Sequence, residues 1–292
     1  MTAVAAGARP LRPSSLKRNL ALLGTGLLIV YAAIAVEVDP AKILELPGGV
    51  ALVFYKMFLE SGPDWSYLPT AINGMIESLQ LAWVGTVIGA ILSLPLGFFG
   101  AKNVSSGVVS SVMRQVLNAI RAFPEIILAI AIMIPIAGLG PVAGALAIGL
   151  HSVGTLGKLT AEVVEGIDPG PVEAVRAAGG RSLQIQRWGV LPQVLPEIIA
   201  FWLYRFEINI RAAAVLGVVG AGGIGFSLQQ TITFHRYALA GTAIVVVIVA
   251  TIAVDTVSGW VRRRIIEGAE SRIDAGTVEA IGGPLREDTP IG

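Results

Sequence analysis

Residues 173–192 read EAVRAAGGRSLQIQRWGVLP, a polar stretch between two long apolar segments. Pro171 suits the first position of a helix, and Glu173 favours the positive N-terminal end of that helix. The Gly179-Gly180 pair predicts its end after two turns. A second short helix, capped by Ser182, is expected to follow. Two brief helices joined by a glycine hinge are typical of a docking element for another protein, or of an ordinary amphipathic connector, and composition does not choose between these.

Most of the remaining chain consists of apolar blocks. Of the 292 residues, 54% are apolar and 14% are charged, against roughly 25% charged residues in an ordinary soluble domain. A helix needs about 20 mostly apolar residues to cross a bilayer. We therefore expect an all-α integral membrane protein with six transmembrane helices, at about Leu20 to Val36, Ile72 to Gly100, Val116 to Leu139, Val142 to Thr160, Val194 to Val219 and Ala238 to Trp260.

The charge and cysteine counts exclude several classes of function. The 21 Lys and Arg residues against 20 Asp and Glu residues leave a net charge of +1, which argues against bulk nucleic-acid binding. Because the chain has no cysteine, disulfides, iron-sulfur clusters, thiolate metal sites and cysteine nucleophiles are excluded. The 2 histidines leave little for a metal site.

The positive charges of the loops predict the orientation. On one side they are Arg9, Arg12, Lys17, Arg18, Lys102, Arg114, Arg176, Arg181, Arg187, Arg262, Arg263 and Arg264. We therefore expect a plasma-membrane protein with both termini cytoplasmic. The expected parts are a cytoplasmic segment 1–19, a first transmembrane helix 20–36, an extracytoplasmic loop 37–70 with an interfacial segment, a membrane core 71–264 with a cytoplasmic loop 161–193, and a cytoplasmic tail 265–292.

The first span has a second interpretation. A basic stretch, an apolar run and the Ala33-Ile34-Ala35 triplet together also fit a cleavable signal peptide. The extracytoplasmic loop contains the apolar stretch Val50 to Leu59, which is too short to cross the bilayer and is expected to lie along its outer surface. From about Ile273, glycine, proline and mixed charges predict a mobile tail.

The stretch 173–192 resembles the E-A-A signature of permeases in binding-protein-dependent ABC importers. The matching positions are Glu173, Ala174, Gly179, Leu191 and Pro192, whereas Val175 and Gly189 depart from the pattern. The resemblance implies that this loop, Arg176 included, is the coupling helix that fits a groove on an ATPase subunit. It also implies the type I, MetI-like permease fold.

Other segments are similar to the phosphonate-type permeases of this family. The similar runs are RAFPEIILA at Arg121 to Ala129, Gly140 to Gly179, and LYRFEINIRAAAVLGVVGAGGIG at Leu203 to Gly225. The likeness covers roughly Ser78 to Arg264. It implies a homodimer that carries phosphorus oxyanions inward, fed by an extracytoplasmic binding protein. It also implies that ATP and Mg are bound by two cytoplasmic ATPase subunits, and that this chain holds no cofactor and catalyses no reaction.

Four polar residues of the fifth span fall near the middle of the bilayer, where an unpaired charge costs roughly 2.5 to 3.5 kcal/mol. The spacing allows two pairs on one helix face, Glu207 with Arg211 and Arg205 with Asn209. These pairs either lock the fifth helix against its neighbours or provide an arginine that helps an anion to pass.

Further polar groups lie in the third and fourth spans. Glu125 follows Pro124, which can interrupt a helix, and His151 with Ser152 lies within the fourth span. We expect His151 to form an intramembrane hydrogen bond, although its ring can also donate to a phosphoryl oxygen. Gly85 and Gly89 have the spacing that allows close helix packing.

Two motifs resemble nucleotide-binding loops without meeting their requirements. Residues 220–225 read GAGGIG, but they follow a helical span rather than a strand. The glycines of this run, Gly220, Gly222, Gly223 and Gly225, are expected to form an outer bend that opens and closes the pathway as a periplasmic gate. The segment ending at Gly157-Lys158 lacks the glycine and the Ser/Thr of a phosphate loop.

These patterns predict a permease subunit that dimerises around a pathway and works by alternating access. An importer for another small solute is the alternative, because the coupling loop indicates an ABC importer but does not identify the solute that it carries. An intramembrane enzyme would need a nucleophile or metal constellation, and none is visible in the sequence. An ATP-independent channel would not explain the coupling loop.

Overall fold

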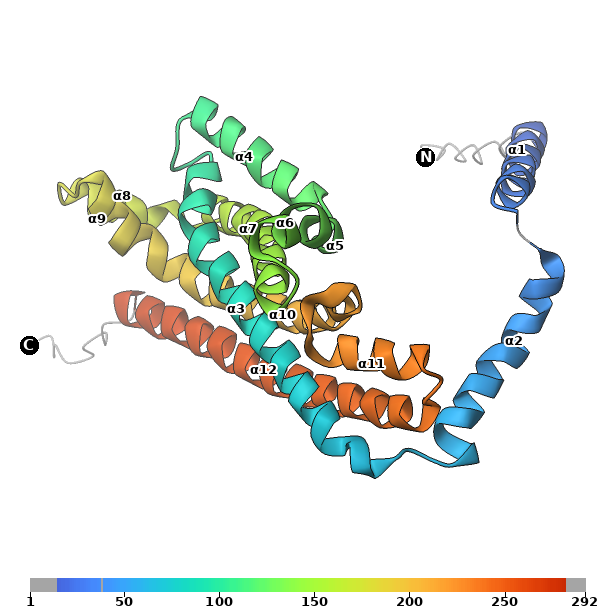
Figure 1. Cartoon of the computed structure of the whole chain (residues 1–292). Coiled ribbons are helices and arrows are strands. Elements are labelled where there is room, and N and C mark those ends of the chain that lie inside the picture. Colours follow the sequence, from blue (N-terminus) through green and yellow to red (C-terminus); the bar gives the residue numbers. More distant parts are fainter. Residues whose placement is uncertain (1–14, 38, 282–292) are drawn as a thin grey trace, which may run out of the picture. The chain divides into compact units, whose positions relative to one another are not determined.

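The computed structural model describes residues 15–37 and 39–281, and side chains in the last helix as far as Ile266. The described residues form helices and turns without a β-strand. They fall into two compact units, residues 1–55 and 56–292, which are described separately (Figure 1). The first unit contains α1 (Ser15–Ala35) and α2 (Pro40–Tyr55).

The second unit contains the remaining elements. In chain order these are η1 (Lys56–Glu60), η2 (Trp65–Tyr67), α3 (Leu68–Gly100), α4 (Gly107–Ala122), α5 (Glu125–Leu128), η3 (Ala129–Met133), α6 (Ile134–Ala137), α7 (Pro141–Glu165), α8 (Pro169–Ala177), α9 (Ser182–Gln184), η4 (Ile185–Val190), α10 (Leu191–Leu216), η5 (Gly217–Ala221), α11 (Gly223–Thr233) and α12 (Tyr237–Ile281). In Figure 1 the pair α8 and α9 projects at the end of this unit away from α11.

Four helices are long and apolar enough to cross a membrane, and the described chain reaches six spans if each of two bent helix pairs counts as one. The four are Leu16–Ala35, Trp65–Gly100, Pro141–Glu165 and Tyr237–Ile266. The bent pairs are Gly107–Ala122 with Glu125–Ala137, at 88°, and Ser182–Ala221 with Gly223–Thr233, at 58°. The expected count of six therefore agrees with the structure only when a span is allowed to bend.

The third span is not the single helix expected from residues 116–139. It breaks at Phe123 and Pro124, whose backbones are extended, and α5 begins at Glu125 in a new direction. A proline ring disfavours the helical conformation of the residue before it, so α4 ends at Ala122. The interruption expected at Pro124 is confirmed, and it places Glu125 in the first turn of a new helix.

The last helix is longer than the apolar pattern predicts. The expected span ended at Trp260 and a mobile tail was expected from about Ile273, but α12 continues as a helix to Ile281. The stretch Val50 to Leu59, expected to lie along the outer surface, is divided between the end of α2 and the π-helical turn η1.

Helices α3 and α7 form the most extensive packing interface of the second unit. Small residues allow their backbones to approach closely. A Cβ atom added at Gly85 would lie 2.7 Å from Ile148 Cγ2, and one added at Gly89 would lie 2.5 Å from Ser152 Cβ. The close packing expected at Gly85 and Gly89 is therefore confirmed. A Cβ atom added at Gly97 would likewise lie 2.5 Å from Thr160 Cβ.

Candidate functional site

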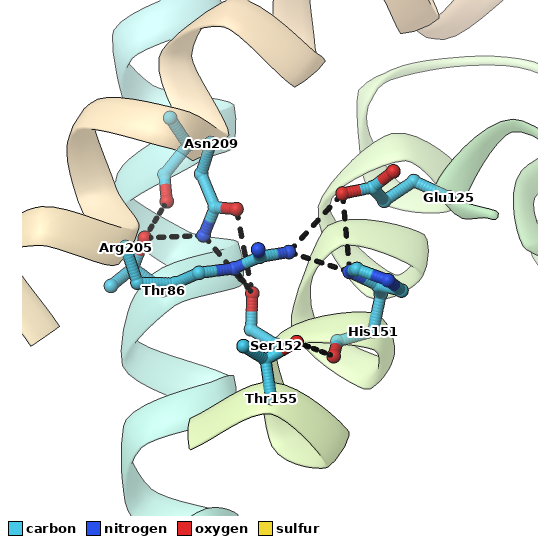
Figure 2. A network of polar contacts seen from close by, with 8 residues as sticks. Thr86, Glu125, His151, Ser152, Thr155, Arg205 and Asn209 are labelled. Atoms are coloured by element: carbon cyan, nitrogen blue, oxygen red, sulfur yellow. Dashed lines mark hydrogen bonds and ion pairs between the residues drawn. The ribbon is translucent and has the colours of Figure 1, made fainter. Parts of the chain in front are cut away.

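A cluster of buried and partly buried polar side chains lies where α3, α5, α7 and α10 meet (Figure 2). Its members are Thr86 on α3, Glu125 on α5, His151 and Ser152 on α7, and Arg205 and Asn209 on α10. Ser152 stands near the middle of the 25 residues of α7, which places the cluster near the middle of that span. We call these six residues the Arg205 cluster.

Arg205 is the cationic centre of the cluster and is only 6% exposed. Its Nε donates to Ser152 Oγ at 3.0 Å, and its Nη2 donates to Glu125 Oε1 at 3.1 Å. The Nη2 atom also lies 2.6 Å from His151 Nδ1. The guanidinium thus joins α10 to two elements that precede it in the chain by more than 50 residues.

His151 Nδ1 lies within hydrogen-bond distance of two groups, Arg205 Nη2 at 2.6 Å and Glu125 Oε1 at 3.1 Å. Arginine carries only donors and an ionised carboxylate only accepts, so the role of Nδ1 depends on the tautomer. When Nδ1 accepts from Arg205, the ring proton of a neutral imidazole sits on Nε2. The expected intramembrane hydrogen bond of His151 is therefore confirmed, with Arg205 as its partner.

Asn209 is fully buried and connects the uncharged members of the cluster, Thr86 and Ser152. Its Nδ2 donates to Thr86 Oγ1 at 2.8 Å and to Ser152 Oγ at 3.1 Å. Thr86 in turn donates to the carbonyl oxygen of Ala82 at 2.6 Å. The sequence did not single out Thr86, although its place between Gly85 and Gly89 on the packing face was a usable signal.

The two side-chain pairs expected within the fifth span are wrong. Glu207 forms its ion pair with Arg262 of α12 at 3.5 Å, and Arg211 forms one with Asp255 of α12 at 3.6 Å. Arg205 and Asn209 meet at Ser152 instead of pairing directly. The spacing i, i+4 places two residues on one face of a helix, but the packing of α10 against α7 and α12 offers each charge a partner on another helix.

The Glu207–Arg262 and Arg211–Asp255 pairs include side chains that are more exposed than any in the Arg205 cluster. Glu207 is buried, yet its Oε1 makes no hydrogen bond to the described residues. Arg262 approaches that oxygen at ion-pair distance and also stacks 5.9 Å from the Tyr204 ring. The Arg211 and Asp255 side chains are 52% and 44% exposed. The structure thus joins α10 and α12 by these two pairs, separately from the Arg205 cluster.

The first half of the expected coupling element is a helix with well-defined ends. Asp168 caps α8, because its side chain accepts from the Gly170 N–H at 2.9 Å. At the other end Gly180 N–H donates to Val175 O and Gly179 N–H donates to Arg176 O, which is the Schellman pattern. Gly179 has φ +82. The glycine stop is confirmed, while the helix begins at Pro169, two residues before the expected Pro171.

The second half of this element is not a separate short helix. α9 runs through η4 into α10 as one continuous helical stretch. Ser182 does not cap it, because the reciprocal bond at its start is Arg181 N–H donating to Gln184 Oε1 at 2.8 Å. Gly189 lies against α8, since a Cβ there would come 3.0 Å from Val172 Cα. The departure from the family pattern at Gly189 is thus a point of close packing.

Side chains that the sequence did not single out fix the base of the loop. Gln193 accepts from the Asp168 N–H at 3.1 Å and donates to the Gly189 carbonyl at 2.6 Å. Arg114 of α4 pairs with Glu165 at the end of α7, and Glu165 accepts from the Lys102 N–H at 2.7 Å. Gln193 thus ties the start of α8 to α10, and Glu165 ties the end of α7 to α4 and to the α3–α4 connection.

The exposed side of the coupling element contains a cleft lined by charged and polar residues. A cleft of about 570 Å³ between α8, η4 and the α3–α4 connection is lined by polar residues that include Asn103, Glu165, Glu173, Arg176, Ser182 and Gln186. Glu173, Ala174, Arg176 and Gly179 are exposed, as is Pro192, and Leu191 is partly buried. Their assignment to ATPase coupling stays a prediction.

The glycine run after α10 forms the expected bend. Gly220, Gly222 and Gly223 have φ values of +94, +83 and +71, conformations that other residues rarely adopt. A Cβ at Gly225 would lie 1.7 Å from the Ala214 carbonyl oxygen, so the turn packs back onto α10. The use of this bend as a gate stays a prediction.

Among the side chains that the structure describes, no group of three or more His, Asp or Glu residues is placed to hold a metal ion. The charged groups of the Arg205 cluster pair with one another, and this set suits an anion rather than a cation, because its centre is a buried guanidinium.

Comparison with known proteins agrees with the family resemblance. Residues 93–267 match the family described as binding-protein-dependent transport system inner membrane component. The chain is 41% identical over 202 residues to the phosphite transport system permease protein PtxC of Stutzerimonas stutzeri, covering 69% of this chain and 73% of that protein. It is 34% identical over 263 residues to the phosphate-import permease protein PhnE of Mycolicibacterium smegmatis. That match covers 88% of this chain and 49% of the relative, so the chain spans about half of that relative.

A solved structure shares the fold. An inward-facing structure of the MetNI methionine ABC transporter aligns with a TM-score of 0.61 and 21% identity, covering 69% of this chain and 97% of the other. This likeness shows the MetI-like fold alone.

Proposed function

Because the chain belongs to the family of binding-protein-dependent transport system inner membrane components, we propose that it imports phosphorus oxyanions through the Arg205 cluster. The names of its relatives, which transport phosphite and phosphate, support this cargo class. The single observation that carries the proposal is a guanidinium, 6% exposed, whose carboxylate partner is itself 25% exposed.

Glu125 is the group that an incoming anion replaces. Its side chain is 25% exposed, against 7% for Arg205, and it lies in the first turn of α5, immediately after the break at Pro124. A small turn of α5 moves this carboxylate without disturbing the bond from Arg205 Nε to Ser152 Oγ. A phosphoryl group then takes the vacated donor of Arg205, because guanidinium forms charge-assisted bonds to phosphate and carboxylate oxygens alike.

His151 provides a second donor for the same anion. In the tautomer whose Nδ1 accepts from Arg205, the ring proton lies on Nε2 and can be donated to the anion. A neutral imidazole N–H binds an oxyanion without adding a charge that would hold it too tightly. An importer needs binding that favours entry and still permits release.

The proposed assembly follows the family. Two copies of this chain enclose the pathway, an extracytoplasmic binding protein delivers the oxyanion, and two cytoplasmic ATPase subunits bind ATP and Mg. The element formed by α8, α9 and η4 docks on the ATPase subunits, with Glu173 and Arg176 at the contact. Both termini lie in the cytoplasm. ATP binding and hydrolysis shift this element, and the continuous helix from Ser182 into α10 carries the shift toward Arg205.

The test is uptake by the reconstituted importer. Proteoliposomes containing this chain, its ATPase subunits and its binding protein are given radiolabelled phosphite, phosphate or methylphosphonate, and uptake is normalised to the amount of permease. The variants are Glu125→Gln, Arg205→Gln and the double variant. ATPase stimulation by the binding protein is measured in parallel.

A substrate role and a purely structural pair give opposite results for the double variant. Each single change leaves one buried charge unpaired, so each lowers the amount of folded protein. Removing both charges restores the protein level in either case. We expect uptake by the double variant to stay below about a tenth of the wild-type value, because a neutral amide does not replace a charge-assisted bond worth roughly 1.5 to 3 kcal/mol. Near-normal uptake by the double variant would overturn the role of Arg205.

A further inference from the structure

One face of α7 is polar from the Arg205 cluster to the end of the helix that joins the coupling loop. His151, Thr155, Lys158 and Glu162 follow each other at intervals of four, three and four residues, which places them in one stripe along the helix. Thr155 and Lys158 are partly exposed and Glu162 is exposed. We call these four residues the α7 stripe.

The other faces of α7 are covered. Val153, Leu156, Thr160 and Val164 are almost fully buried, and α3, α4 and α10 pack against the helix. On the side of α4, Gly154 allows the backbones of Leu117 and Arg121 to approach, because an added Cβ would lie 2.9 and 2.8 Å from their backbone atoms. Among the residues that the structure describes, the stripe is therefore a face of α7 that stays partly open between the Arg205 cluster and the end of the helix.

The chemistry of the stripe does not suit contact with lipid. Lys158 and Glu162 are 37% and 52% exposed toward the end of a candidate span. A charge costs roughly 2.5 to 3.5 kcal/mol at the centre of a span, and charged side chains near its end face water, a water-filled passage or protein rather than hydrocarbon. Their mutual pair is loose, with Lys158 Nζ 3.8 Å from Glu162 Oε1, and it leaves donors of the ammonium group available for another anion.

We propose that the α7 stripe is the exit route of the oxyanion and that Lys158 is the binding group it meets after Arg205. This inference rests on the proposed function. The rise of 1.5 Å per residue places Lys158 about 10 Å from His151 along the helix axis. Thr155 stands between them, with its hydroxyl donating to the His151 carbonyl at 3.5 Å (Figure 2).

A second cation at this spacing shortens the time that the anion spends on Arg205. An anion leaving the guanidinium for water alone must give up a charge-assisted bond before it gains a new partner. With Lys158 within reach, the loss of one bond is accompanied by the gain of another, and weak binding at several sites is what permits passage. Lys158 is thus expected to affect the rate of transport at saturating substrate more than the apparent KM.

The test uses the absence of cysteine from the native chain. Lys158→Cys is assembled into the importer and treated either with an aminoethyl methanethiosulfonate, which restores a positive charge, or with a sulfonatoethyl analogue, which adds a negative charge. We expect the untreated variant to transport about tenfold more slowly than wild type, the loss of one charge-assisted bond. The aminoethyl reagent should restore at least half of the rate, and the sulfonatoethyl reagent should not.

A matched control separates this role from the ion pair. Glu162→Gln removes the partner of Lys158, so a purely structural pair predicts that it slows transport as much as Lys158→Gln does. We expect Glu162→Gln to keep more than half of the wild-type rate. The wild-type complex is treated with each reagent as well. Because this chain has no cysteine, any change in its transport rate comes from labelling of the partner subunits.

Each outcome has a defined meaning. Wild-type rates for Lys158→Gln, or equal recovery with both reagents, would overturn the exit route while leaving the role of Arg205 intact. If wild-type vesicles themselves take up no phosphorus oxyanion, the proposed function fails as well. Uptake is normalised to permease level, so a variant that folds less well still reports its rate per molecule.

Discussion

Substitution of Gly89 by alanine tests how the packing of α3 on α7 supports the Arg205 cluster. The added Cβ would lie 2.5 Å from Ser152 Cβ, whereas carbon atoms in contact normally stand at about 3.5 to 4.0 Å. Both atoms are attached directly to the backbones, so no side-chain rotation relieves the overlap. The two helices must separate locally by about 1 Å.

That separation acts on hydrogen bonds as well as on packing. The bonds from Asn209 Nδ2 to Thr86 Oγ1 and Ser152 Oγ measure 2.8 and 3.1 Å, and a shift of about 1 Å stretches at least one of them beyond hydrogen-bond distance. Overpacking costs about 1 to 3 kcal/mol, and each neutral hydrogen bond contributes about 1 kcal/mol. We therefore expect Gly89→Ala to lower the free energy of unfolding by about 2 to 4 kcal/mol.

The assays are thermal unfolding of the purified permease and uptake per molecule at a permissive temperature. Gly107→Ala is the neutral control, because nothing lies within 4 Å of its added Cβ. Gly97→Ala is the matched control, because its Cβ also overlaps α7, 2.5 Å from Thr160 Cβ, at a distance from the cluster. Both Gly89→Ala and Gly97→Ala should lose stability, while only Gly89→Ala should also lose uptake per molecule. A Gly89→Ala protein as stable as Gly107→Ala, or equal uptake losses at both overlapping sites, would refute the reasoning.

Three further predictions concern other parts of the chain. Gly179→Val places a β-branched residue at φ +82, so it should cost about 1 to 3 kcal/mol locally and reduce ATPase stimulation while the membrane helices stay folded; normal stimulation and uptake would contradict the coupling assignment. The double variant Glu207→Gln with Arg262→Gln should be more stable than the single variant Arg262→Gln, because the single change leaves the buried Glu207 carboxylate unpaired; thermal unfolding of the two variants checks this. A cysteine at position 14 should react only with membrane-permeant reagents in intact cells, and labelling by an impermeant reagent from outside would reverse the predicted topology.

Local sequence signals predicted those features that depend on a few neighbouring residues. The apolar blocks indicated the helices, Pro124 indicated the break in the third span, and Gly179 indicated the end of α8. The glycine run 220–225 indicated the bend after α10. Each of these follows from the backbone conformations that one residue type allows or forbids, so the sequence contains the required information within a few positions.

Boundaries that depend on packing were predicted less well. The second helix of the coupling element was expected to be short, but it continues into α10, and its η4 segment packs on α8 where Gly189 meets Val172. The base of this element is held by Gln193 and by the Arg114–Glu165 pair. No local pattern identifies such partners, since they stand 25 and 51 residues apart in the chain.

The sequence by itself determined which polar residues lie inside the membrane, because a charge in an apolar block is visible without a structure. Only the tertiary structure decided their partners. Arg205 pairs with Glu125 from 80 residues away, and Glu207 pairs with a residue of α12 and not with its helix neighbour Arg211. The physical reason is that a helix period defines which residues share a face, whereas the crossing of α10 over α7 and α12 defines what that face meets.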